Sequence, residues 1–438
     1  MIKIKYTILT LTLIFTVIGC KPGTPGPVTD DELDDELPLT TSSISHVTFY
    51  IENSGSMDGY VNGATEFVEV VNKLAQYPNL VLDDVPFSYN LISGKANPIK
   101  NEKKLKVYEI GNDPSILKSK LTKAGLKTPT SGNSDLNEMF KIALENAKAD
   151  SISILISDGI YDVGGQANPL NSLKTEAQST TTTFIQRLKT DNIETLLIKF
   201  ESDFDGLYHP SNVEDPRGKS VLIKQKRPYY IWIFGNSDLL NKYFPEHELE
   251  ALKGYVDVAR FRKLTNESVP YKAIGYNNSG FKLDFRNDNT FKLDRTVMDS
   301  SHFNIAVNLN HLKMSRNYLT SASNYSSINK YSVVKVTEIG SGPPTALKPY
   351  LKSLLPFETT HIISVSTPNP PETGKINITL KNVFPKWIEE SNTDSDDPFD
   401  GSTTETFGLK TLIGGIEEAY KTVSKTNQLA EFNILIKN

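Results

Sequence analysis

The chain of 438 residues contains one cysteine, Cys20, together with six histidines and two tryptophans. A single cysteine cannot form a disulfide within the chain, so no disulfide framework is expected. The histidines show no metal-ligand spacing, which argues against a zinc site. Basic residues do not outnumber acidic ones (47 against 52, formal net charge −5), so the composition gives no electrostatic footprint for nucleic acid.

The composition is that of a globular protein. Apolar residues make up 38% of the chain and charged residues 23%, and the glycines and prolines are spread along it rather than gathered in repeats. A length of 438 residues predicts two folded domains, each with room for a sizeable core.

The first 19 residues have the pattern of a signal peptide. Lys3 and Lys5 give a basic start, and the apolar stretch over residues 8–18 is too short to span a bilayer. The segment ends in Val-Ile-Gly-Cys20, which resembles a bacterial lipoprotein signal. This resemblance implies cleavage before Cys20, acylation of Cys20, and an exported protein anchored by lipid to a membrane of the cell envelope. The outer membrane is expected, with the protein facing the periplasm or the cell surface. The alternative is an ordinary secretory signal in which Cys20 has no role.

Residues 20–44 form a predicted flexible tether, because a Pro/Gly-rich stretch at 22–27 precedes an acidic run at 30–36. From 45 to 247, strand and helix patterns alternate, which predicts a doubly wound, Rossmann-like α/β domain with helices on both faces of the sheet. The predicted strands are 46–51, 85–93, 104–110, 151–157, 194–200 and 229–234. A helix is predicted after the opening loop, where Phe67, Val70, Val71 and Leu74 are spaced three and four residues apart, and further helices are predicted at 114–124, at 135–147, at 180–188 and up to residue 243.

Beyond residue 254 the pattern changes to short alternating stretches separated by Asn, Ser, Gly and Pro. This predicts a β-rich, sandwich-like C-terminal domain over residues 255–438. The expected strands are 281–285, 303–309, 331–336, 361–365, 375–380 and 432–436, with one helix over 407–423.

Oxygen-bearing side chains follow the first predicted strand. Glu52, Ser54 and Ser56 alternate in a short loop, and Met57 comes next. This loop resembles the metal-ion-dependent adhesion site of von Willebrand factor A (VWA) domains, whose first motif reads Asp-x-Ser-x-Ser. Here Glu52 stands where that motif has aspartate.

Two further residues extend the resemblance, which covers roughly residues 45–247. Ser134 lies just before the helix predicted at 135–147, where the family has a threonine. Asp158 follows the apolar stretch 151–157, as the family's aspartate does. The order of the three elements and their structural context agree with the family.

The resemblance implies a divalent metal site formed by Glu52, Ser54, Ser56, Ser134 and Asp158. Magnesium is the expected ion, with manganese or calcium as alternatives, and all five residues offer the oxygen donors that such hard cations prefer. An acidic side chain of a protein partner would complete the metal shell. Glu52 adds one methylene relative to aspartate, so it could hold the ion through a water, or the exchange could disable the site. Alternatively, these side chains only hydrogen-bond the loop ends of the sheet.

These features predict a non-enzymatic protein that binds a protein partner. One alternative is a structural or assembly scaffold with a degenerate metal site. Another is a serine hydrolase using Ser54 or Ser56, although neither serine stands in a Gly-x-Ser-x-Gly motif. Residues 202–226 are predicted either to border the binding face as a long loop or to form a hairpin with no special role.

Overall fold

The computed structural model of this protein describes residues 44–81, 85–97, 102–126, 134–161, 169–210, 220–265, 268–296, 301–328, 330–340, 345–353, 357–367, 371–395 and 404–438. Residues 42–438 form one compact unit. The signal peptide, Cys20 and the tether up to residue 43 lie outside the described residues. Within the described ranges, no helix is long and apolar enough to cross a bilayer.

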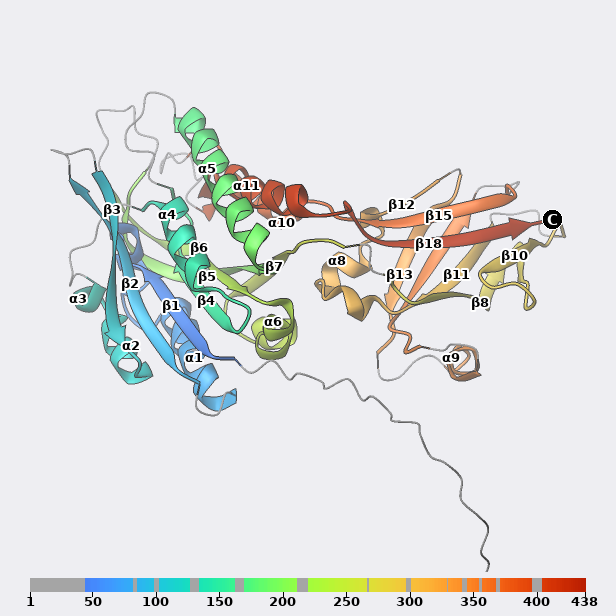
Figure 1. Ribbon diagram of the computed structural model, residues 1–438, viewed down its shortest axis with the longest axis horizontal. Coiled ribbons are helices and arrows are strands. Elements are labelled where there is room, and N and C mark those ends of the chain that lie inside the picture. The colour runs from blue at the N-terminus through green and yellow to red at the C-terminus, as the bar shows by residue number, and fades with distance from the viewer. Residues whose placement is uncertain are drawn as a thin grey trace, which may run out of the picture. The chain divides into compact units, whose positions relative to one another are not determined.

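The protein is a mixed α/β structure built on a seven-stranded sheet, with further β-sheets (Figure 1). The order of strands in the large sheet is β3-β2-β1-β4-β6-β5-β7. Strands β2, β1 and β4 run parallel, and the other neighbours pair antiparallel. The strands are β1 (His46–Glu52), β2 (Phe87–Asn97), β3 (Glu102–Gly111), β4 (Ser151–Ser157), β5 (Glu194–Tyr208), β6 (Val221–Gly235) and β7 (Tyr255–Phe261).

The antiparallel half of the sheet differs from the doubly wound arrangement predicted from the sequence. Strands β5 and β6 pair along 15 residues each, from Glu194 with Gly235 to Tyr208 with Val221. They therefore form a long hairpin instead of being joined by a crossover helix, which parallel strands would require.

Helices cover both faces of the seven-stranded sheet, as the sequence predicted. One core packs α1 (Glu66–Val81), α2 (Pro114–Lys120) and α6 (Ser237–Tyr243) against the sheet. The other core contains α4 (Leu136–Asn146), α5 (Pro169–Thr190) and α11 (Leu409–Val423). Strand β4 lies between these layers, and all seven of its residues are buried, which explains its nearly continuous apolar sequence. The short helix α3 (Lys123–Leu126) contacts α2, and the short helix α7 (Glu246–Glu250) contacts β7.

Two further sheets share a hydrophobic core that includes Phe291, Phe303, Ile363 and Phe432. One sheet has the order β12-β15-β18-β10-β9 and the other β13-β14-β11-β8. Their strands are β8 (Tyr271–Ser279), β9 (Phe281–Leu283), β10 (Thr290–Leu293), β11 (Ser301–Val307), β12 (Tyr325–Ser327), β13 (Ser332–Glu338), β14 (His361–Thr367), β15 (Gly374–Lys381) and β18 (Gln428–Lys437). The remaining elements are α8 (Arg316–Thr320), α9 (Lys348–Ser353), α10 (Lys386–Glu390), the pair β16 (Asn392–Thr393) and β17 (Thr406–Phe407), and three 3₁₀ turns, η1 (Gly55–Gly59), η2 (Leu309–Leu312) and η3 (Ala322–Asn324).

Two segments beyond residue 247 pack with the seven-stranded sheet and not with the smaller ones. Strand β7 pairs with β5 at the edge of the sheet. Helix α11 lies along α5 (Figure 1), where Thr181 Oγ1 donates a hydrogen bond of 2.9 Å to the carbonyl of Gly415. The hydroxyls of Tyr420 and Thr195 are 2.8 Å apart. The sheet and its helical layer therefore extend past the range 45–247 predicted for the α/β domain.

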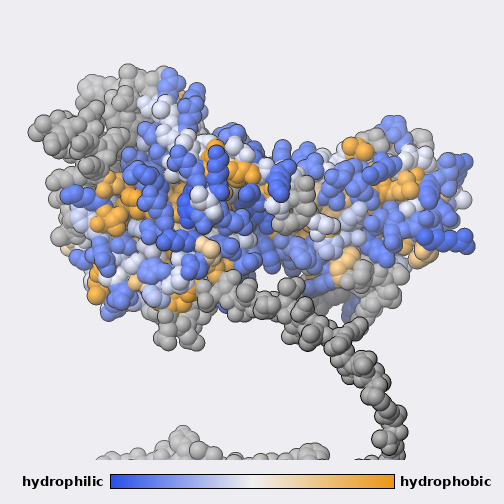
Figure 2. All heavy atoms as spheres, viewed as in Figure 1, coloured by the Kyte–Doolittle hydropathy of each residue, from blue (hydrophilic) through white to orange (hydrophobic). Residues whose placement is uncertain are grey.

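Hydrophilic residues predominate on the face shown in Figure 2, and hydrophobic residues lie there in small separate patches. The most exposed large apolar side chains, Leu222, Val334 and Phe285, belong to three different parts of the chain. The visible face therefore offers no extended apolar surface for docking, and the buried polar groups are the better guide to function.

Adjacent glycines in α11 provide a test of its packing on α5. A Cβ on Gly415 would lie 2.5 Å from the carbonyl oxygen of Ala177, whereas a Cβ on Gly414 would have no neighbour within 4 Å. We expect Gly415→Ala to lower the free energy of unfolding by about 1–3 kcal/mol, because two helix backbones would have to separate. Gly414→Ala should raise it by roughly 0.5–1 kcal/mol through helix propensity. Urea unfolding of both variants measures the difference, and equal effects would contradict the packing of α11 on α5.

Candidate metal centre

The candidate site lies at the carboxyl ends of β1 and β4, two neighbouring parallel strands from which the chain continues in opposite directions across the sheet. Strand β1 is flanked by β2 on one side and by β4 on the other, and all three strands point the same way. In open α/β sheets, ligands bind outside the carboxyl ends of the strands at such a switch point. Glu52 is the last residue of β1, and Asp158 directly follows β4.

The five residues predicted from the sequence are brought together at this edge. The Oγ atoms of Ser54 and Ser56 are 2.8 Å apart. The hydroxyl of Ser134 donates to Oε1 of Glu52, which links the loop before α4 to the end of β1. Ser54 also hydrogen-bonds Glu52, and Ser56 hydrogen-bonds Asp158.

Local sequence explains why these side chains stay in place. Ser54 precedes the 3₁₀ turn η1, with Ser56 inside it, so both hydroxyls are held on a short, tight loop. Ser134 comes just before Asp135, whose side chain caps α4 by accepting a hydrogen bond of 3.1 Å from the Glu138 amide.

The two carboxylates are buried next to each other. Glu52 is 0% exposed and Asp158 is 1% exposed. Burial raises the pKa of Glu52 to about 7, with a further contribution from the negative charge of Asp158, against the hydrogen bonds from Ser134, Ser157 and Ser54. Burial also raises the pKa of Asp158, although the positive charge of Arg227 and the Ser56 hydrogen bond oppose that rise.

Each carboxylate keeps one oxygen without a hydrogen-bond partner among the described residues. These atoms are Oε2 of Glu52 and Oδ2 of Asp158, both of which are buried. Buried polar atoms normally have a partner, so two such oxygens in one cluster fit the binding of a cation or a proton.

The donor set fits a hard divalent cation. It consists of two carboxylates and three hydroxyls, all oxygen ligands of the kind that magnesium, manganese and calcium prefer. Among the described residues there is no group of three or more His, Cys, Asp or Glu that could hold a metal. Binding here would therefore depend on the serine hydroxyls.

Sequence reasoning missed Arg227, a positive charge close to this cluster. Arg227 lies on β6, is 1% exposed, and its guanidinium carbon is 4.3 Å from the ring centre of Tyr208 and 5.4 Å from that of Phe204. The side chain of Tyr60 hydrogen-bonds the guanidinium. Its positive charge interacts with Tyr60, Tyr208 and Asp158.

Arg227 reaches the cluster because the β5–β6 hairpin continues beyond the end of β4 and packs on η1. A Cβ on Gly206 would lie 2.6 Å from Cα of Gly59, and one on Gly59 would lie 2.3 Å from the Phe204 ring. Both glycines are thus needed for this close approach. The prediction that residues 202–226 form a hairpin is confirmed for its arms, and residues 211–219 lie outside the described part. Ser202, Phe204, Gly206 and Tyr208 are buried, and the residues between them are more exposed. Such an alternation with a period of two residues indicates a strand.

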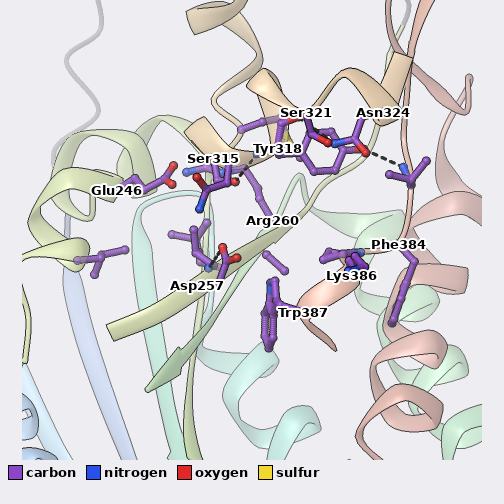
Figure 3. Close-up of a pocket in the computed structure, with 18 of the residues that line it drawn as sticks. Glu246, Asp257, Arg260, Ser315, Tyr318, Ser321, Asn324, Phe384, Lys386 and Trp387 are labelled. Atoms are coloured by element: carbon purple, nitrogen blue, oxygen red, sulfur yellow. Dashed lines mark hydrogen bonds between the residues drawn. The ribbon is translucent and has the colours of Figure 1, made fainter. Parts of the chain in front are cut away.

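A cavity of about 190 Å³ lies away from the predicted residues (Figure 3). Segments around β7, α7, α8 and α10 line it, and Tyr318 and Trp387 contribute aromatic side chains. Burial raises the pKa of its carboxylate Glu246 to about 7. Arg260 in its wall is paired with Glu194 at 2.7 Å. None of the five residues of the candidate metal centre lines this cavity.

The raised pKa of Glu52 predicts how stability depends on pH when no metal is present. Because the folded pKa of about 7 exceeds the ordinary value of 4.5, stabilisation by the protonated form is complete below pH 4.5. It is lost as pH rises through 7, by on the order of 3 kcal/mol. Glu52→Gln removes this loss, so in EDTA the variant should gain stability relative to the wild type between pH 5 and pH 8. Urea unfolding across that range measures the difference.

The exposed residue Glu145 supplies the matched control, since Glu145→Gln removes a carboxylate that is not buried. The stability of this control should run parallel to that of the wild type over the same pH range. A Glu52→Gln profile that also ran parallel to the wild type would contradict the raised pKa of Glu52.

No protein-family model matches the chain, and no curated protein does. The assignment of the candidate site therefore depends on its motif pattern and on the geometry of Glu52, Ser54, Ser56, Ser134 and Asp158.

Proposed function

We propose that this protein is an exported lipoprotein that binds a protein partner through a divalent metal ion. A VWA-like, Rossmann-like domain built on the seven-stranded sheet would carry the metal, and the two smaller sheets would form a sandwich-like second domain. The observation that carries the proposal is the convergence of two buried carboxylates and three hydroxyls at the switch point of the sheet.

In this proposal Ser54, Ser56, Ser134, Asp158 and Glu52 hold the ion, which supplies a Lewis-acidic position for an outside ligand. Magnesium is the expected ion, with manganese or calcium as alternatives. The hydroxyls are neutral, so the protein places only two negative charges around a divalent ion. Such a site remains attractive to one more carboxylate, which an acidic side chain of the partner can provide.

Recognition is favoured over hydrolysis by the contacts of the two serines. The hydroxyls of Ser54 and Ser56 hydrogen-bond each other and the carboxylates of Glu52 and Asp158. A serine nucleophile needs a general base aligned to take its proton, most often a histidine. The imidazole of His209 lies against Gly55, where a Cβ would be 3.2 Å from its Nε2, but its hydrogen-bond partner among the described residues is Ser220, whose hydroxyl is 2.7 Å from Nδ1. The contacts of Ser54 and Ser56 form an oxygen cage, which suits ion binding.

Metal binding is tested by thermal unfolding of residues 42–438 in EDTA and then with magnesium, manganese or calcium. An ion at 100 times its Kd stabilises the folded state by about 2.7 kcal/mol, which should raise Tm by a few degrees. The rise should disappear in Asp158→Ala. It should persist in Asp288→Ala, which removes an exposed carboxylate in a remote turn. An unchanged Tm for the wild type with all three ions would refute the metal centre and favour the scaffold hypothesis.

The membrane anchor has its own test at Cys20. With Cys20 acylated, the full chain should partition into the detergent phase of a Triton X-114 extract of cell envelopes. Cys20→Ser removes the acylation site, so the variant should move to the aqueous phase and keep its signal segment. A variant that partitions like the wild type would show that Cys20 is not the anchor.

A further inference from the structure

The cavity shown in Figure 3 is separate from the candidate metal centre, and two acidic side chains line it. Glu246 begins α7, and Asp257 lies on β7. Each carboxylate accepts a backbone N–H, Glu246 from Arg316 and Asp257 from Val258 at 2.8 Å. These hydrogen bonds hold the carboxylates in position, but a neutral N–H leaves the net negative charge of each group in place.

The basic side chains in the wall of this cavity are paired with acids outside it. Arg260 pairs with Glu194 at 2.7 Å and Lys386 with Glu390 at 2.5 Å, and neither acid lines the cavity. The wall therefore carries two excess negative charges. Burial disfavours the ionised form of both cavity carboxyl groups and raises the pKa of each, so a bound cation would relieve a cost that the protein otherwise bears.

Aromatic rings in the same wall suit an organic cation better than a bare metal ion. Tyr318, Phe384 and Trp387 line the cavity (Figure 3). The hydroxyl of Tyr318 is already used, since it donates to the Lys381 carbonyl at 2.7 Å and accepts from the Val383 amide at 2.8 Å. Tyr318 therefore offers a ligand its ring. Aromatic faces attract ammonium groups, and quaternary ammonium ligands are commonly recognised in this way.

Trp387 adds a hydrogen-bond donor that calls for an oxygen on the ligand. Trp387 is only 9% exposed, and its buried indole N–H has no acceptor among the described residues. A buried tryptophan N–H usually finds an acceptor. A cavity of about 150 Å³ can hold benzene, so the volume of about 190 Å³ here has room for a small amino alcohol.

We propose that this cavity binds a small organic ammonium ion that also carries an oxygen, that is, an amino alcohol. The carboxylates of Glu246 and Asp257 balance the ammonium charge, and the indole N–H of Trp387 donates to the ligand oxygen. The aromatic rings pack against the carbon atoms bound to the nitrogen. The site is independent of the proposed metal centre, because none of the candidate metal ligands lines the cavity.

The test is calorimetric titration of residues 42–438, which form one compact unit, with choline in the presence of EDTA. The matched neutral probe is the alcohol in which a tert-butyl group replaces the trimethylammonium group of choline, and methyl glucoside is the probe for a sugar. Choline should bind roughly tenfold or more tightly than the neutral alcohol, because only choline gains from the carboxylates and from cation–π contact.

Four variants assign the contacts. Glu246→Gln and Asp257→Asn keep the shape of each side chain and remove its charge, so each should weaken choline binding by roughly tenfold. Trp387→Phe keeps a ring and removes the N–H, so it should weaken the binding of choline but not that of tetramethylammonium, which has no oxygen. The control Glu248→Gln removes an exposed carboxylate from the same helix as Glu246 and should bind choline like the wild type.

The comparison of probes on the wild type decides the proposal even if a variant does not fold. No binding of choline at millimolar concentration, or equal binding of the neutral alcohol, would overturn it. Binding of methyl glucoside without choline would also overturn it and make the cavity a sugar site. Folded Glu246→Gln and Asp257→Asn that bind choline like the wild type would place the choline site elsewhere. Because EDTA is present throughout, each of these results leaves the test of the metal centre untouched.

Discussion

Two carboxylates that the fold buries side by side determine the chemistry available at the end of the sheet. Glu52 and Asp158 meet because β1 and β4 are adjacent and parallel, which brings their carboxyl ends to the same edge. Burial and mutual repulsion raise the pKa of Glu52 to about 7, so the pair is costly when both groups are ionised. A proton or a cation can relieve that cost. The three serine hydroxyls nearby favour a cation, since they add ligands that a proton does not need.

The antiparallel half of the sheet supports this edge from outside the parallel strands. A hairpin as long as β5–β6 extends past the end of β4, so its arms can pack on η1. The close approach at Gly59 and Gly206 fixes the distance between the two segments. One consequence is that Arg227, far from Asp158 in sequence, comes close enough to influence its pKa. The antiparallel hairpin of the mixed sheet thus places the buried, positively charged side chain of Arg227 near this edge.

Sequence patterns predicted local structure well and long-range placement poorly. Strand β4 and helix α6, with its Asn236 cap, follow from apolar runs and capping residues, which are local signals. The five candidate ligands were found because loop residues after strands carry recognisable motifs. Helix α11 has an amphipathic face, but an apolar stripe does not say which sheet it will cover, and it covers the large one. Arg227 was missed for a similar reason, because its role depends on a strand pairing that no short motif encodes.

A scaffold with a dead site explains the charges in this cluster less well than a metal centre does. Hydrogen bonds from Ser134 and Ser54 could be accepted equally by an amide at position 52, without the cost of burying a carboxylate, which is several kcal/mol per ion. A purely structural cluster should also satisfy both oxygens of each carboxyl group. Instead, Oε2 of Glu52 and Oδ2 of Asp158 are buried without hydrogen-bond partners. Retaining two charged groups with one unused oxygen each is intelligible if a cation uses those oxygens.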